Sequence, residues 1–152
     1  MKDIAFQLVL KWAREGEDKD ILLTDDFTRL TLDTIALCAM DFRFNSFYTE
    51  AMHPFVEAMN RYLGYSGKKA NRPAIVNKVF GSAEEQQYKE DQATMDRVAK
   101  QVIDRRRANS VDKQDLLNTM LYKEDPKTGA RMRDELITTN MITFLIAGHE
   151  TT

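Results

Sequence analysis

Residues 141–152, MITFLIAGHETT, form the stretch that decides how this chain folds. An apolar run leads at helical spacing into Ala147, Gly148, His149 and Glu150, followed by two threonines. A helix that is apolar on nearly every face is typical of the interior of a large fold, where each polar atom needs a partner. The polar segment therefore indicates a functional site on a buried helix. We expect the chain to be a piece of a larger enzyme that stops inside this helix.

The composition limits the classes of protein to which the chain can belong. Its 152 residues are 43% hydrophobic and 30% charged, which suits an ordinary folded domain and excludes a disordered tail. The net charge of -2 argues against a nucleic-acid partner. No apolar run reaches the length of a membrane span, although an anchor before Met1 stays possible. The single Cys38 excludes an internal disulfide and favours a reducing compartment, so we expect a cytoplasmic protein.

The hydrophobic periodicity predicts an all-α chain without a domain linker. The expected helices are one through Ile4, Leu8 and Trp12 that ends at Gly16; one over 27–40, capped by Thr24 or Asp25; and one that starts at Pro54. A long helix is expected to start with a capping box of Ser82 and Glu85 and to carry an apolar stripe of Tyr88, Met95, Val98, Ala99, Val102 and Ile103. A short helix over 116–121 and a last one with Asp134 and Glu135 in its first turn complete the set.

The segments between these helices also carry expectations. The aromatic loop 41–48 is predicted to contribute to the core, and 68–73 to form a surface connection after Gly64 and Gly67. His53 is interpreted as a residue that starts a helix, and residues 105–107, three arginines, as a solvated helix end. Cys38 lies among apolar residues and is expected to be buried as a small hydrophobic side chain.

The last helix carries the candidate chemistry. Phe144, Ala147, Gly148 and Thr151 share one face by their spacing of three and four residues. The small residues at 147 and 148 leave room for a flat ligand against the backbone. The hydroxyl of Thr151 can donate to the carbonyl oxygen of Ala147, which tends to open a helix. Because Glu150 adds a group that carries protons, the pattern favours controlled proton delivery to a ligand bound over Gly148.

Residues 147–152, Ala-Gly-His-Glu-Thr-Thr, resemble the oxygen-activating helix of the cytochrome P-450 haem-thiolate monooxygenases. Residues 29–35 and 42–47 look like the fatty-acid hydroxylases of bacteria and fungi in which the haem domain is fused to an NADPH-flavin reductase. The resemblance covers most of the chain and is weakest between Tyr65 and Gly81. It implies that residues 1–152 are the central part of a P-450 haem domain, from its fourth to its ninth main helix.

The resemblance also implies roles for individual residues. Thr151 would stabilise bound oxygen and relay protons, with Glu150 as its acidic partner. The haem would be contacted by Phe144, Ala147, Gly148 and Thr152. Leu63 would face the channel for the fatty acid, with Met59 as its neighbour, and the long helix after Ser82 would form the other half of the channel roof.

The resemblance further implies the reaction and the cofactors of the parent protein. We expect haem, together with FAD, FMN and NADPH on a fused reductase, and the hydroxylation of a fatty acid or similar lipid with O2. The family binds its iron through a cysteine loop that this sequence lacks, because Cys38 lies in a different context. The chain alone is therefore expected to be inactive, and it holds no metal ligand for the haem.

Two other classes of protein remain open from the residues alone. Residues 149–152, His-Glu-Thr-Thr, are also the first part of His-Glu-x-x-His, in which His149 would bind zinc and Glu150 would be the general base of a peptidase. The residue after Thr152 would separate that pattern from the haem family. A non-catalytic helical module that binds lipids would need only the apolar channel.

Overall fold

The computed structural model describes residues 1–16, 19–49, 51–71 and 74–150, without the side chains of residues 70, 71, 74–82 and 150. The described part of the chain is helical, as the periodicity predicts. Its helices are α1 (Lys2–Glu15), α2 (Leu23–Met40), α3 (Pro54–Asn71), α4 (Ala74–Ala108), α5 (Leu116–Tyr122) and α6 (Asp134–Glu150). Over these residues no helix combines the length and the apolar content needed to cross a membrane.

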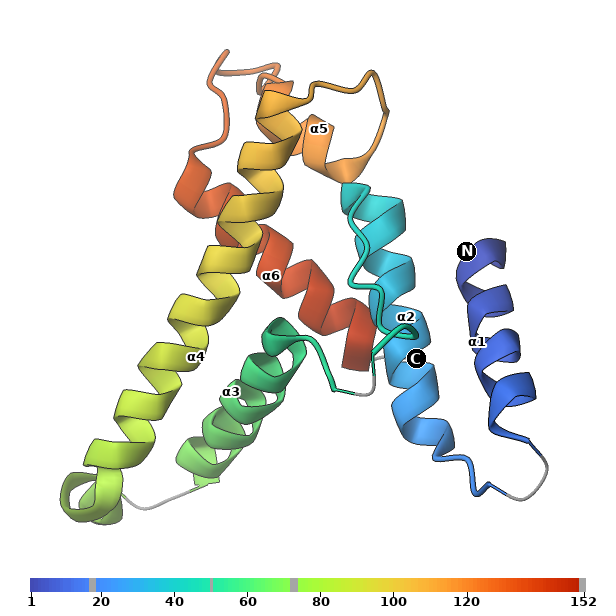
Figure 1. Ribbon diagram of the computed structural model, residues 1–152. Coiled ribbons are helices and arrows are strands. Elements are labelled where there is room, and N and C mark those ends of the chain that lie inside the picture. Colours follow the sequence, from blue (N-terminus) through green and yellow to red (C-terminus); the bar gives the residue numbers. More distant parts are fainter. Residues whose placement is uncertain (17–18, 50, 72–73, 151–152) are drawn as a thin grey trace.

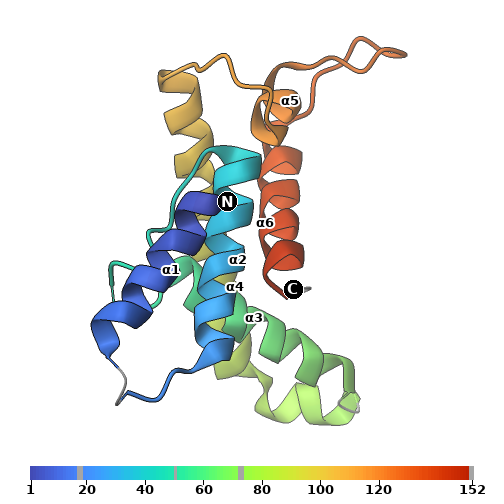
Figure 2. The ribbon, with the colours of Figure 1, turned by 90° about the vertical axis from the view of Figure 1, so that its right-hand side faces the viewer.

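The helices are arranged around α6. Figure 1 shows α3 lying antiparallel to α4, and α1 beside α2 on the opposite side of the molecule. Helix α6 runs obliquely from α4 towards the middle of α2 and contacts both, as the perpendicular view in Figure 2 also shows. The short α5 contacts α2 and the beginning of the chain's last helix. The C-terminal end of α6 is therefore positioned mainly by α2.

The main core fills the space between α2, α3, α4, α5 and α6. Each of these helices contributes fully buried apolar side chains at helical spacing: Leu32 and Ala36, Phe55 and Met59, Met95 and Ala99, Leu117, and Ile137 and Met141. A smaller cluster of Ile4 and Leu8 with Phe47 attaches α1 to α2 and the following loop. Since burial of each large side chain contributes about 1.5–3 kcal/mol, these residues supply the main driving force for the arrangement.

Helix α2 starts differently from the prediction. It begins at Leu23, and no side chain makes a cap hydrogen bond there, so the expected caps Thr24 and Asp25 are wrong. Asp26 is instead buried in the first turn and accepts hydrogen bonds from Lys11 and from the indole N–H of Trp12 on α1. Burial raises the pKa of Asp26, but these two hydrogen bonds outweigh it and hold the pKa below its ordinary value.

The aromatic loop is held on α2 by two buried charged side chains. The carboxylate oxygens of Asp33 accept from the backbone N–H groups of Phe44 and Ser46, each at 2.9 Å. Arg29 donates to the carbonyl oxygen of Thr49 at 3.1 Å and to that of Ser46. The predicted contribution of this loop to the core is confirmed for Phe44 and Phe47, whereas Tyr48 is exposed.

Helix α3 begins as predicted, and His53 starts it. The carbonyl oxygen of His53 accepts from the N–H of Val56 at 2.8 Å, and its Nδ1 accepts from that of Phe55 at 3.2 Å. Burial lowers the pKa of His53, which keeps Nδ1 available as an acceptor. The helix then continues through Gly64 to Asn71, so the predicted surface connection over 68–73 is wrong for residues 68–71.

Helix α4 begins earlier than the sequence suggests. It starts at Ala74, so Ser82 and Glu85 lie inside the helix and do not form the predicted capping box. Its predicted apolar stripe is confirmed, because Met95, Ala99, Val102 and Ile103 are buried. The short helix over 116–122 and the acidic first turn of α6 also agree with the prediction.

The prediction that the arginines at the end of α4, residues 105–107, are all solvated is wrong for the middle one. Arg106 is only 5% exposed. Its guanidinium forms two parallel hydrogen bonds of 2.9 and 2.7 Å with Asp115, and it donates to Asn118 Oδ1 at 2.7 Å and to the carbonyl oxygen of Met40 at 2.9 Å. These hydrogen bonds join the ends of α2 and α4 to the first turn of α5. Asp115 also caps α5 by accepting from the N–H of Asn118 at 2.8 Å.

Replacing Arg106 by Met should destabilise the fold strongly, because the carboxylate of Asp115 would stay buried without its charged partner. Breaking a buried ion pair on one side costs about 3–5 kcal/mol. Arg107→Met is the matched control, since Arg107 forms the same paired hydrogen bonds with Asp134, both at 2.7 Å, in an exposed position. Its loss should matter little in water. Denaturant unfolding that gives equal effects for both variants would contradict this account.

The two glycines of α3 are positions at which a substitution should raise the stability of the fold. An added Cβ at Gly64 or Gly67 would meet nothing within 4 Å. Because alanine is favoured over glycine inside a helix by about 1 kcal/mol, each Gly→Ala substitution should raise the free energy of unfolding by about that amount. Thermal unfolding of the two single variants measures the gain, and a loss of stability would show that these positions need glycine for another reason.

Candidate functional site

The candidate site lies on the second half of α6, whose residues divide into a buried and an exposed side. Ile137, Met141 and Leu145 face the main core and are at most 3% exposed. Leu136 and Phe144 are 48% and 39% exposed, and Ala147 is exposed as well. Neighbouring exposed apolar side chains on one side of a helix can mark a surface that binds a ligand or another part of the protein. The exposed side of α6, defined by Leu136, Phe144 and Ala147, is therefore the candidate ligand surface.

Gly148 follows Ala147 directly, so it is turned by about 100° around the helix, and the Cβ position of Gly148 faces α2. The Cβ that an L-residue would carry at this position would come within 2.9 Å of Cγ1, 3.0 Å of Cβ and 3.1 Å of Cγ2 of Ile35 on α2. The small size of Gly148 is thus explained by the close approach of α2. This contact gives position 148 a reason to be glycine that the sequence argument did not contain, and the predicted contact of Ala147 and Gly148 with haem stays a prediction.

Two other threonines of α6 form the type of hydrogen bond that is predicted for Thr151, from the hydroxyl to the carbonyl oxygen four residues earlier. Thr139 Oγ1 donates to the carbonyl oxygen of Glu135 at 2.9 Å, and Thr143 Oγ1 donates to that of Thr139 at 2.8 Å. The helix stays continuous at both places. The predicted bond of Thr151 lies outside the described residues, as do Thr152 and the side chain of Glu150. Their roles therefore stay predictions.

Comparison with known proteins decides the family. The family model of cytochrome P450 matches residues 1–152, the whole chain. The chain belongs to the cytochrome P450 family. It is 55% identical over 152 residues to a bifunctional cytochrome P450/NADPH–P450 reductase of Aspergillus oryzae, and 53% identical over 152 residues to a self-sufficient cytochrome P450 monooxygenase of Exserohilum turcicum. Both alignments cover all of this chain and 14% of the relative's length.

A relative from Fusarium oxysporum, also a bifunctional cytochrome P450/NADPH–P450 reductase, is 50% identical over 152 residues and is covered to the same 14%. These matches confirm the predicted resemblance to P450s that are joined to a reductase. They favour the P450 family over the zinc-peptidase alternative, because the P450 family model matches the whole chain, whereas the roles of residues 147–152 stay predictions. Among the described side chains, no group of three or more His, Cys, Asp or Glu residues could hold a metal ion.

The predicted channel residues lie on α3 of this P450 chain. Met59 is fully buried in the main core, and Leu63 is half-buried and packs against it. Helix α3 is held to α4 by Tyr62 and Tyr88, whose rings stack with centroids 4.5 Å apart. The hydrogen bond with Tyr88, together with burial, raises the pKa of Tyr62 to about 12. The proposed channel function of Leu63 and Met59 stays a prediction, and the stacked rings fix the helix that carries both.

Cys38 differs from the prediction. The residue lies on α2 among apolar neighbours in the sequence, but its side chain is exposed and forms no disulfide. The side of α2 that carries Cys38 is thus not part of the core of this chain. The sequence pattern could not show this, because nearly every position of 35–40 is apolar.

The structure also contains an open cleft of about 610 Å³ that involves none of the predicted site residues. It lies between α1 and the end of the aromatic loop, and the basic side chains of Lys11, Arg14, Lys19 and Arg29 line it together with Glu15. Arg29 is occupied by the loop carbonyls, and Lys11 and Lys19 form ion pairs with Glu15 at 3.7 and 3.2 Å. These charges are used within the protein, so the cleft adds nothing to the candidate site.

Proposed function

We propose that the parent protein is a haem-dependent monooxygenase that inserts one oxygen atom of O2 into a C–H bond of a fatty acid or similar lipid. Electrons from NADPH would arrive through FAD and FMN on a fused reductase. The names of the relatives from Aspergillus oryzae and Exserohilum turcicum support the monooxygenase and the fused reductase. This chain would contribute one side of the haem site and part of the substrate channel, and it would have no activity by itself.

The exposed side of α6 is the observation that carries this proposal. A porphyrin is flat and largely apolar, and Phe144 and Ala147 offer it an aromatic ring and a methyl group on an open surface. Haem, when bound, supplies the chemistry that activates O2. Thr151 follows Ala147 by four residues and Phe144 by seven, so the helical period places it on the same side. Its hydroxyl would hold a proton next to the ligand, and Glu150 would exchange that proton with solvent.

The lipid substrate and the location of the protein complete the proposal. Leu63 and Met59 on α3 would line the channel for the acyl chain, with α4 as the second wall. We place the protein in the cytoplasm, and the exposed thiol of Cys38 supports a reducing compartment.

The test uses the full-length parent protein. Purified protein should contain haem, show the Soret band of a thiolate-bound haem when reduced under carbon monoxide, and consume NADPH when a fatty acid is added. A non-catalytic lipid-binding module would bind the fatty acid without iron. Purified full-length protein that takes up no haem, even with added hemin, would overturn the proposal.

Replacing Thr151 by Ala should separate NADPH use from product formation, because the proton relay would lose its hydroxyl. General acid–base groups contribute about 10²–10⁴-fold to the steps they assist, so we expect the fraction of electrons that reaches product to fall by about tenfold or more, with release of peroxide. Thr139→Ala is the control, since it removes an exposed hydroxyl with the same type of backbone hydrogen bond on the same helix. Equal coupling in both variants would remove Thr151 from its proposed role.

A further inference from the structure

We propose that Ile35 is a positioning residue, which holds the oxygen-side end of α6 in place through its contact with Gly148. The inference rests on the proposed function, and it adds a residue of α2 for which the motif on α6 gives no signal. Ile35 would touch neither haem nor substrate. It would act by fixing the distance between α2 and α6 immediately before Glu150 and Thr151.

The contact between the two helices leaves no room for a Cβ at position 148. Cγ1, Cβ and Cγ2 of Ile35 lie 2.9, 3.0 and 3.1 Å from the position that a Cβ of residue 148 would take. These atoms form the base of a β-branched side chain, which is stiff at χ1 and cannot turn away from an added methyl group. Any side chain at position 148 would therefore push the two helices apart.

The glycines of α3 do not share this requirement. Gly64 and Gly67 have nothing within 4 Å of an added Cβ. A glycine inside a helix lowers the free energy of unfolding by about 1 kcal/mol relative to alanine, so a glycine is favoured there only where a side chain would not fit. At position 148 the close approach of Ile35 supplies that reason.

Helix α2 is the fixed partner in this contact. Next to Ile35 in the helix, Leu32 and Ala36 are fully buried in the main core. Two residues before Ile35, on the opposite side of the helix, Asp33 binds the backbone of the aromatic loop. Near the end of α6, by contrast, Phe144 and Ala147 are exposed. A change at the contact should thus move the end of α6 and, with it, the segment that contains Thr151.

The experiment uses the full-length haem protein with five variants. Gly148→Ala should push α6 away from α2, and Ile35→Ala should leave the space at Gly148 unfilled. The double variant Ile35→Ala, Gly148→Ala replaces the lost atoms of Ile35 by the new methyl group. Ile35→Val keeps the branched carbon atoms that make the contact. Gly67→Ala is the matched control, since it adds the same methyl group to a helix in open space.

Two quantities are measured for each variant: the fraction of NADPH electrons that reaches product, and the temperature at which the haem absorbance is lost. A displacement of about 1 Å can cost about a hundredfold in rate, so a shift of a few tenths of an ångström should reduce the coupled fraction by several-fold up to about tenfold. We expect this loss in Gly148→Ala and in Ile35→Ala. The double variant should recover most of the coupling and of the thermal stability, whereas Ile35→Val and Gly67→Ala should behave like the wild type in coupling.

The outcomes separate this inference from the proposed function. If wild-type protein binds no haem, the proposed function fails and the contact has no catalytic meaning. If wild-type protein is active and the double variant is as uncoupled as Gly148→Ala, then Gly148 serves a ligand directly and Ile35 has no positioning role. If Gly148→Ala does not yield folded protein, the comparison of Ile35→Ala with Ile35→Val decides, and equal coupling in these two variants overturns the inference.

Discussion

The buried guanidinium of Arg106 is the interaction on which the arrangement of the helices depends. From the end of α4, it donates to the carbonyl oxygen of Met40, the last residue of α2. It also binds the carboxylate of Asp115, which caps α5. The next residue, Arg107, binds Asp134 at the beginning of α6. Arg106 thus joins the end of α2 to α4 and α5, and Arg107 adds only an exposed ion pair at the beginning of α6. A buried ion pair of this kind contributes through the cost of leaving either partner alone, more than through the strength of the pair itself.

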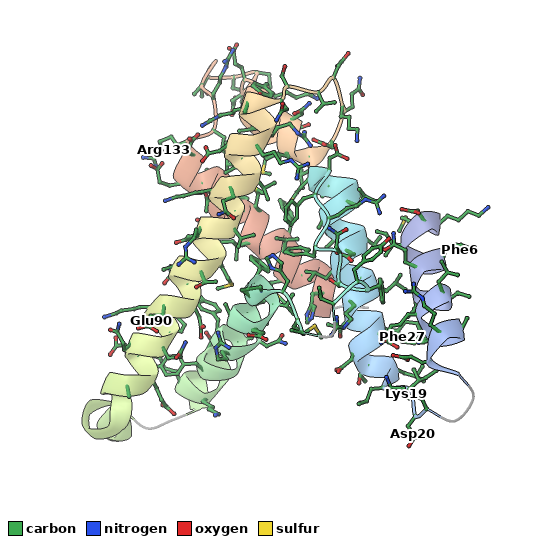
Figure 3. All side chains as sticks on the ribbon, viewed as in Figure 1. Phe6, Lys19, Asp20, Phe27, Glu90 and Arg133 are labelled. Atoms are coloured by element: carbon green, nitrogen blue, oxygen red, sulfur yellow. The ribbon has the colours of Figure 1, made fainter. Side chains whose placement is uncertain are left out.

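From its beginning at Asp134, α6 crosses the core. Ile137, Met141 and Leu145 pack in the core, and Gly148 packs on Ile35 at the end of the helix. Phe144 and Ala147 stay exposed. Exposed apolar residues also occur on α1, where Phe6 points away from α2 (Figure 3). This chain spans 14% of the length of the relatives from Aspergillus oryzae and Exserohilum turcicum.

The sequence predicts the helices and the family, but several features of the site depend on contacts between distant residues. The stripe on α4 and the start of α3 at Pro54 follow from spacing and local rules, and the structure confirms both. The burial of Arg106 could not be predicted, because its two neighbours in the sequence are also arginines and only the fold brings Asp115 to the middle one. The reason for Gly148 was missed in the same way, since Ile35 lies on another helix. A capping-box pattern such as Ser82 and Glu85 also fits the interior of a helix, and the exposure of Cys38 depends on which side of α2 is covered.

The most direct measurement is an experimental structure of the full-length protein with haem bound. The account predicts that Phe144 and Ala147 lie against one face of the porphyrin, with Thr151 on the same side and Gly148 still packed on Ile35. A porphyrin bound elsewhere, with the exposed side of α6 covered by other protein segments, would contradict the account.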